Sequence, residues 1–275
     1  MTAVVGALPA RRSRTRRPVL INTGRLLILV AFLCSWELLS DTNTIDPFYF
    51  GSPAGVWARL SQWFESGTSQ GPITEQVWVT VQETLLGFGI GTGLGLLCGV
   101  VLGRVRVLSD LFAPYIKTMN SVPRIVLGSV FTIWFGLGIG SKVALAVVLV
   151  FFAVFFNAFQ GTRDVDRALV AHARLLGASH LAVTTQVVLP SALSWITASL
   201  HVAFGFAVTG SIVGELLGAQ QGVGLLISQA QANFDPDGVY AGLVLTAAFA
   251  LTAEALITAL ERRLMRWKPR HGGEN

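Results

Sequence analysis

The chain has 275 residues, of which 52% are hydrophobic and only 13% are charged. Soluble domains carry about 25% charged residues, so this composition indicates a membrane protein. The basic residues cluster in a few segments between apolar runs, which argues against a nucleic-acid-binding surface, and Cys34 and Cys98 lie inside apolar runs without disulfide or metal-ligand spacing.

The first 18 residues contain the run RRSRTRR and are expected to form a disordered basic tail in the cytoplasm, near anionic lipid headgroups. An arginine run before an apolar segment is also typical of a secretory or twin-arginine signal. Because the apolar run ends in Trp36, Glu37 and Ser40 without a small-residue cleavage site, a retained first helix is favoured. One transmembrane domain is then expected over 19–268, followed by a tail over 269–275.

Six segments are apolar and long enough to cross a bilayer, which requires about 20 residues. They are 21–40, 77–102, 111–136, 143–160, 195–217 and 239–260. The third is the least apolar, because it contains Lys117, Asn120, Pro123 and Arg124. Between the first two, residues 53–65 carry apolar side chains at helical spacing, which predicts an amphipathic helix at the outer membrane interface.

The loop charges give the orientation. With the N-terminus inside, sixteen Lys or Arg residues lie in cytoplasmic segments and two, Arg59 and Lys142, lie outside. The cytoplasmic set is Arg11, Arg12, Arg14, Arg16, Arg17, Arg25, Arg104, Arg106, Arg163, Arg167, Arg174, Arg262, Arg263, Arg266, Lys268 and Arg270. This positive-inside bias predicts an all-α integral membrane protein with six transmembrane helices and both termini cytoplasmic.

Catalytic and nucleotide-binding motifs are not evident. The sequence has no GxxxxGK[ST] phosphate loop, GxSxG or HExxH, so neither a P-loop ATPase nor these hydrolase classes is indicated. The string GIGTGLGLLCG resembles a dinucleotide fingerprint, but it lies inside an apolar span with no preceding strand. Gly87, Gly91 and Gly95 recur at every fourth position, which instead predicts close helix packing in the membrane.

Inserting a charged side chain at the bilayer centre costs roughly 2.5–3.5 kcal/mol of free energy. Polar residues inside the predicted spans are therefore candidates for a functional or structural role. The candidates for a hydrated translocation pathway are Glu83, Asn120, Arg124, Asn157 and Glu215. For Glu83 and for Glu254, snorkelling or a structural pair is an equal alternative. The Pro123–Arg124 step predicts an irregular, cavity-facing piece of helix, because proline removes a backbone donor.

The polar segment 161–192 is too long for a simple turn and falls on the cytoplasmic side. It is predicted to form a short helix, a glycine joint at Gly177 and a second helix closed by Pro190. Structured loops of this length are usually functional.

This segment resembles the cytoplasmic loop of membrane-spanning permease subunits in binding-protein-dependent ABC importers. That loop has the form EAA, three residues, Gly, about a dozen residues, Pro. Gly177 and Pro190 match the glycine and proline, and Ala173, Arg174 and Ala178 match neighbouring positions. The sequence departs from the pattern where Ala171 replaces the usual glutamate and His172 the first alanine.

Further strings resemble the same family in the same order, from Thr80 to Trp267. They are TVQETLLGFGIGTGLG, NSVPRIVLGSVFTIWFGLGIGSK, GELLGAQQGVGLLISQAQANFDPDGVYAG and RRLMRW. Within the family, the strings look most like the branch that serves taurine, alkanesulfonates, nitrate, and thiamine or riboflavin precursors.

The resemblance implies a type I ABC importer permease fold in the bacterial inner membrane. It also implies a second copy of the permease, two cytoplasmic ATPase subunits that carry ATP and Mg, and an extracytoplasmic binding protein that delivers a small organic solute or anion. The chain itself would bind no cofactor and catalyse no reaction. The residues expected to couple to the ATPase are Ala171, His172, Ala173, Arg174, Gly177, Ala178 and Pro190.

Two other classes are considered. An ion-coupled secondary transporter could use Glu83, Glu215 and Glu254, but the inverted repeats that favour this class are not evident in the hydropathy pattern. A membrane enzyme would need a nucleophile, a metal cluster or a His/Asp constellation, which the sequence does not indicate.

Overall fold

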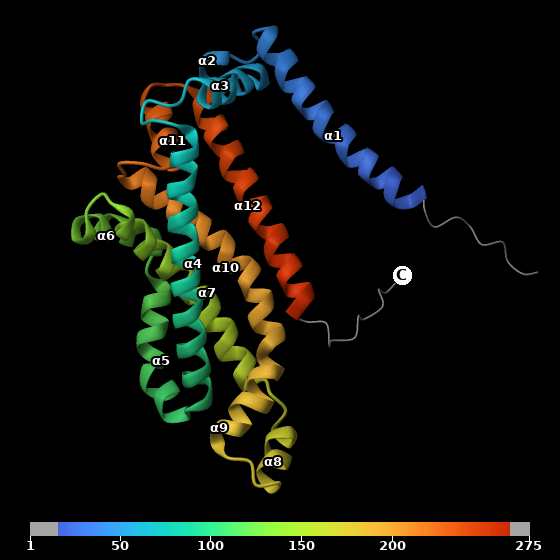
Figure 1. Cartoon of the computed structure of the whole chain (residues 1–275), viewed down its shortest axis with the longest axis vertical. Coiled ribbons are helices and arrows are strands. Elements are labelled where there is room, and N and C mark those ends of the chain that lie inside the picture. Colours follow the sequence, from blue (N-terminus) through green and yellow to red (C-terminus); the bar gives the residue numbers. More distant parts are fainter. Residues whose placement is uncertain (1–15, 265–275) are drawn as a thin grey trace, which may run out of the picture.

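The computed structural model describes residues 16–264, and over this range the chain is helical apart from turns and one isolated bridge between Thr68 and Gly71 (Figure 1). The predicted tails lie outside the described residues, over 1–15 at one end and 269–275 at the other. Residues 16–18, placed in the N-terminal tail by the sequence, belong to the first helix.

Within residues 16–264, five helices are long and apolar enough to cross a membrane. They are α1 (Arg16–Asp41), α4 (Ile73–Arg104), α7 (Ile139–Arg163), α10 (Leu189–Leu217) and α12 (Pro236–Leu264). They coincide with five of the six predicted spans.

The predicted span 111–136 is not continuous. It is divided into α5 (Arg106–Ser121), a 3₁₀ turn η1 (Arg124–Val126) and α6 (Leu127–Phe135). Val122 is extended, with φ −77° and ψ 130°, because the ring of the following Pro123 disfavours a helical conformation there. The irregular segment predicted from the Pro-Arg step is therefore confirmed.

The core consists of α4, α7 and α10, and α7 is its most deeply buried span. Gly87, Gly91 and Gly95 face α7, where an added Cβ would overlap Ala146, Val150 or the backbone near Val154. The predicted packing role of these glycines is confirmed. Because the contact positions on both helices rise together along the chain, α4 and α7 run parallel (Figure 1).

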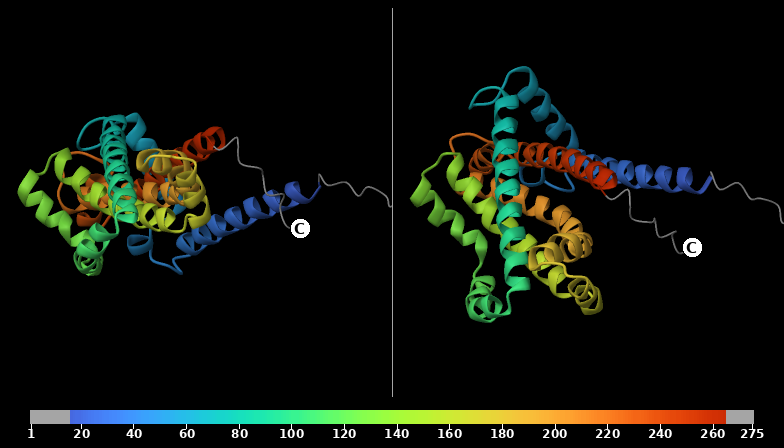
Figure 2. Two further views of the ribbon diagram at one scale, coloured as in Figure 1. Left: turned by 90° about the horizontal axis from the view of Figure 1, so that it is seen from below. Right: turned by 60° about the horizontal axis from the view of Figure 1, so that its bottom comes forward.

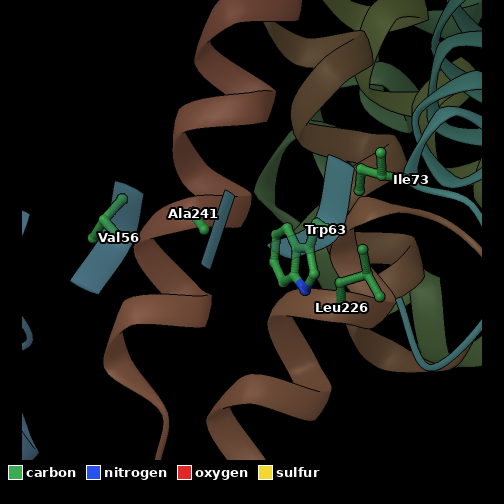
Figure 3. Packing of buried hydrophobic residues seen from close by; sticks show 5 residues of the cluster. All are labelled: Val56, Trp63, Ile73, Leu226 and Ala241. Carbon is green, nitrogen blue, oxygen red and sulfur yellow. The ribbon is translucent and has the colours of Figure 1, made fainter. Parts of the chain in front are cut away.

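One end of the bundle is closed by α2 (Pro47–Phe50), α3 (Pro53–Glu65) and α11 (Val223–Ala232). Figure 3 shows Trp63 of α3 between Ala241 of α12 on one side and Ile73 and Leu226 on the other, in a buried apolar cluster. The helix predicted at 53–65 is thus present, and one of its faces packs on the protein.

The opposite end carries α8 (Arg167–Leu175), α9 (His180–Val183) and a π-helical turn, η2 (Thr184–Val188). The sequence placed a helix end at Pro190, and this was wrong: α9, η2 and α10 follow one another without a break. Pro190 lies in the first turn of α10, directly after the π turn, in which the N–H of Leu189 pairs with the carbonyl of Thr184.

Two helices are peripheral. The spans of α1 and α12 bury little of their surface within the chain, and Figure 2 shows α1 projecting past the end of α12. Glu254 of α12 is paired with His201 of α10, with 2.6 Å between Oε1 and Nδ1. Of the alternatives open for Glu254, the structure supports a structural pair.

Candidate functional site

A buried polar cluster lies where α4, α7 and α10 meet α11. We call it the interhelical polar cluster, and each of its residues is at most 3% exposed. Its members are Gln76, Thr80, Glu83, Thr84, Lys142, Ser211 and Glu215. Burying a polar group costs free energy unless the group is hydrogen-bonded. The hydrogen-bond partners of these residues therefore show which segments the cluster holds in place.

Glu215 is at the centre of this cluster. Its Oε1 accepts a hydrogen bond from Thr80 Oγ1 at 2.6 Å, and its Oε2 accepts one from the backbone N–H of Gly224 at 2.5 Å. A Cβ at Gly222 or Gly224 would overlap the Glu215 side chain, and Gly222 has φ +116°. The two glycines therefore allow the start of α11 to approach the carboxylate closely.

The first backbone donors of α11 are also satisfied by α4. The N–H of Val223 bonds to Thr80 Oγ1 at 3.0 Å, and the N–H of Gly222 bonds to Gln76 Oε1 at 2.9 Å. These N–H groups have no partner within their own helix. The carboxylate of Glu215 at this N-terminus is also favoured by the helix dipole.

Two further ionisable groups complete the cluster. Glu83 interacts with both Glu215 and Lys142, and Lys142 also interacts with Glu215. Lys142 Nζ donates hydrogen bonds to the carbonyls of Leu137 at 2.6 Å and Gly138 at 3.2 Å, just before α7. Glu83 Oε2 is buried without a hydrogen-bond partner among the described residues. Lys142 is therefore a nearby basic group that acts electrostatically on both buried carboxyl groups.

The structure thus brings together two of the five predicted pathway residues, Glu83 and Glu215, and places both inside the bundle. Arg124 lies elsewhere, with its guanidinium carbon 4.5 Å from the centre of the Phe152 ring. Phe152 is about 15 Å along α7 from Lys142, at 1.5 Å per residue.

The remaining two candidates are placed as follows. Asn157 Nδ2 donates to the carbonyl of Ala153, one turn earlier in α7. The side chain of Asn120 lies outside the described part of the structure.

Sequence reasoning missed most of the interhelical polar cluster. Gln76, Thr80 and Thr84 recur at every fourth residue and continue into the glycine stripe that begins at Gly87. This continuity was a usable signal, since a stripe of period four marks one helix face. Lys142 was counted as an outside loop charge, whereas it is buried.

The loop around Gly177 has the predicted helix–glycine–helix form. Asp166 caps the start of α8 by accepting from the N–H of Ala168, and Ser179 accepts from the N–H of Ala182 in α9. Gly177 has φ +84°, its N–H bonds to the carbonyl of Arg174, and the N–H of Ala178 bonds to Ala173. This is a Schellman helix end, which requires a left-handed residue and favours glycine.

The loop presents apolar side chains to solvent. Leu175 is 84% exposed, Leu176 89% and Leu181 74%. Of the predicted coupling residues, Ala171, His172, Arg174 and Gly177 are exposed, whereas Ala173, Ala178 and Pro190 are partly buried.

Among the described residues, no group of three or more His, Cys, Asp or Glu side chains is arranged to hold a metal ion.

Residues 91–266 match the family described as the inner membrane component of binding-protein-dependent transport systems. The chain belongs to this family. It is therefore a permease subunit of an ABC importer in the inner membrane, and ATP hydrolysis in such a system is carried out by a separate subunit.

Several relatives cover most of this chain at similar identity. An aliphatic sulfonates transport permease, SsuC of Bacillus subtilis, is 27% identical over 90% of this chain and 88% of its own length. The taurine transport permease TauC of Escherichia coli is 27% identical, covering 94% and 95%. The riboflavin transport permease RibX of Chloroflexus aurantiacus is 28% identical, covering 89% and 90%.

Solved structures support the fold. A chain of the MetNI methionine ABC transporter in an inward-facing conformation has a TM-score of 0.61 and 21% identity, covering 70% of this chain and 94% of its own. At this identity the likeness shows the fold alone. Membership of the importer family replaces the ion-coupled secondary transporter considered from the sequence.

Proposed function

We propose that the permease passes a small organic anion, with an aliphatic sulfonate or taurine as the first substrates to test. The observation that carries this proposal is near full-length similarity to permeases named for sulfonates and taurine. Substrate would be delivered outside by a binding protein, and two ATPase subunits carrying ATP and Mg would act inside. No cofactor is assigned to this chain.

A deletion strain tests the substrate. It is expected to lose growth on taurine or an alkanesulfonate as sole sulfur source, and to regain it with the plasmid-borne gene. Growth on sulfate serves as the control. Loss of riboflavin uptake with normal growth on sulfonates would overturn the substrate assignment and leave the importer assignment intact.

Energy coupling is tested in the same strain. Uptake should stop when ATP is depleted and persist when a protonophore collapses the proton gradient at constant ATP. Uptake with the opposite pattern would contradict coupling to an ATPase.

We also propose six membrane crossings with both termini cytoplasmic. Because α4 and α7 run parallel, the chain must return between them, and α5, η1 and α6 are the segment available for that crossing. The excess of basic residues in the segments at the α8 end favours the cytoplasm for that end. A reporter fused after residue 104 should give a cytoplasmic signal, and a reporter fused within 42–46 should give an external signal.

The loop around Gly177 is proposed to dock on the ATPase. Exposed leucines on both sides of the joint would be buried by such a partner, at about 1.5–3 kcal/mol for each side chain. The docking residues proposed from the sequence flank the same joint. The usual glutamate is replaced by Ala171, so the contact is proposed to depend on shape and apolar burial.

A second copy is proposed to pair with this chain around the pathway. The apolar face of α6 is a candidate for that contact, with Ile133 82% exposed beside Trp134 and Phe135. We propose that Asn120, Arg124 and Asn157 border the pathway. Glu83 and Glu215 are proposed to act on the pathway indirectly, by holding α11 in place at the outer end of the pathway.

A further inference from the structure

Four arginines surround a cavity at the end of the bundle that carries α8. The cavity has a volume of about 410 Å³ and lies between the α4–α5 turn, the end of α7 and α8. Its arginines are Arg104, Arg106, Arg163 and Arg174. Among the residues whose side chains the structure describes, no Asp or Glu lines it, and none of the four arginines forms an ion pair. Like charges this close favour a bound anion.

A second cavity adjoins the first. It has a volume of about 400 Å³ between α5 and α7, and it shares Ser109 and Arg163 with the arginine cavity. Its walls are mainly apolar, with one acidic and two basic side chains. The lining residues are Ser109, Asp110, Ala113, Ile116, Lys117, Phe155, Phe156, Phe159 and Arg163.

Arg163 joins the two cavities. Its guanidinium carbon lies 5.2 Å from the centre of the Phe159 ring, which belongs to the aromatic wall. A ligand with an anionic head beside the arginine and an apolar chain beside the ring would therefore contact both cavities at once.

The position along the membrane normal fits a lipid. Arg104 and Arg163 are the last residues of the apolar spans of α4 and α7, so they lie at the level where lipid headgroups begin. Basic pockets between helices at this depth are suited to phosphate-containing headgroups. A free anion would use the arginines but would leave the aromatic cavity without a role.

We propose that these two cavities form a binding site for an anionic phospholipid. The phosphate lies among the four arginines, and an acyl chain follows the wall formed by Phe155, Phe156 and Phe159. This site is separate from the transported solute and from ATP, so it goes beyond the proposed import function.

Binding is tested with the purified full-length chain and short-chain lipids, read out by native mass spectrometry. The probes are dioctanoyl phosphatidylglycerol, dioctanoyl phosphatidylcholine and inorganic phosphate. The anionic lipid is expected to bind most tightly. The double substitution Arg104→Gln/Arg106→Gln should weaken that binding at least about tenfold, because each basic residue contributes roughly 1 kcal/mol. Arg25→Gln, an exposed arginine of α1 outside the cavity, should leave it unchanged.

Ala171→Glu gives a second test that keeps all four arginines. Ala171 lines the cavity, so the new carboxylate would pair with them and compete with the lipid phosphate. It should reduce phosphatidylglycerol binding to a similar extent, while the lipid-free protein keeps its unfolding midpoint.

Three results would overturn the proposal. Equal binding of the two lipids would remove the charge preference, and phosphate binding as tightly as phosphatidylglycerol would indicate a site for a free anion. Unchanged lipid binding in the double variant, together with loss of ATPase co-purification, would assign the arginines to carboxylates of the ATPase.

Discussion

Glu215 shows how one buried carboxylate can fix the position of a helix. Thr80 and Gly224 donate to its two oxygens, and the side chain is fully buried. Hydrogen-bond donors, a helix N-terminus and the nearby Lys142 all oppose the cost of burying this carboxyl group. The start of α11 is consequently tied to α4 and α10.

Glu215→Gln is expected to destabilise the protein by about 1–3 kcal/mol. The amide has nearly the same shape, but its NH₂ group would face a donor, and one buried hydrogen bond would be lost. The unfolding midpoint of the purified protein measures this. Glu75→Gln, an exposed glutamate in the first turn of α4, is the matched control and should have little effect. Equal midpoints for the two variants would contradict the anchoring role.

Arg124 is a second single residue for which we propose a role, and that role differs from the anchoring role of Glu215. We propose that Arg124 borders the pathway and acts on the substrate, so Arg124→Ala is expected to reduce uptake of the transported anion by more than it reduces the amount of protein in the membrane. Uptake normalised to membrane abundance checks this. Arg25→Ala should change neither quantity, and parallel loss of abundance and uptake for Arg124→Ala would favour a structural role.

At the scale of elements, the glycine stripe of α4 decides how closely two helices approach. Gly91 faces Val150 and the carbonyl of Val147, whereas an added Cβ at Gly89 would meet nothing within 4 Å. Gly89 and Gly91 both lie within α4 and have a helical backbone. Close helix packing, and not backbone conformation, therefore explains why position 91 requires glycine.

Gly91→Ala is therefore expected to cost about 1–3 kcal/mol through overpacking. Gly89→Ala, two residues away on the open face, should be neutral or stabilise by up to about 1 kcal/mol, because alanine is the better helix former. Unfolding midpoints of the two variants measure the difference. A midpoint for Gly91→Ala at or above that of Gly89→Ala would show that α4 and α7 are not in close contact.

At the scale of the whole molecule, the two ends of the bundle differ. One end is sealed by α2, α3 and α11, including an ion pair of 2.8 Å between Arg59 and Asp235. The other end leaves Leu175 and Leu176 exposed on a loop whose backbone is fixed by helix caps. A rigid loop with exposed apolar side chains is suited to transmitting motion from a partner.

Leu176→Asp is expected to lower co-purification of the ATPase by about tenfold or more, because a leucine contributes about 1.5–3 kcal/mol when buried. Gly177→Glu should do the same, since it places a charged side chain at a left-handed joint. Gly177→Asn should be better tolerated, because asparagine accepts this conformation. Pull-down with the tagged permease checks all three. Full ATPase recovery with Leu176→Asp would exclude docking through these leucines.

The sequence by itself determined the features that depend on composition, spacing and covalent geometry. These are the membrane class, five of the spans, the break at Pro123, the packing glycines of α4 and the joint at Gly177. Each follows from a local cause: apolar length, a missing N–H, a period of four or a left-handed residue.

Only the tertiary structure decided which distant residues meet. Glu215 is 135 residues from Thr80, and no local pattern predicts that contact. The arginine cavity likewise draws on the α4–α5 turn, α7 and α8. The course of the helix through Pro190 depended on a π turn that sequence spacing does not reveal. Polar side chains inside a span can face lipid, a pathway or another helix, and packing alone selects among these.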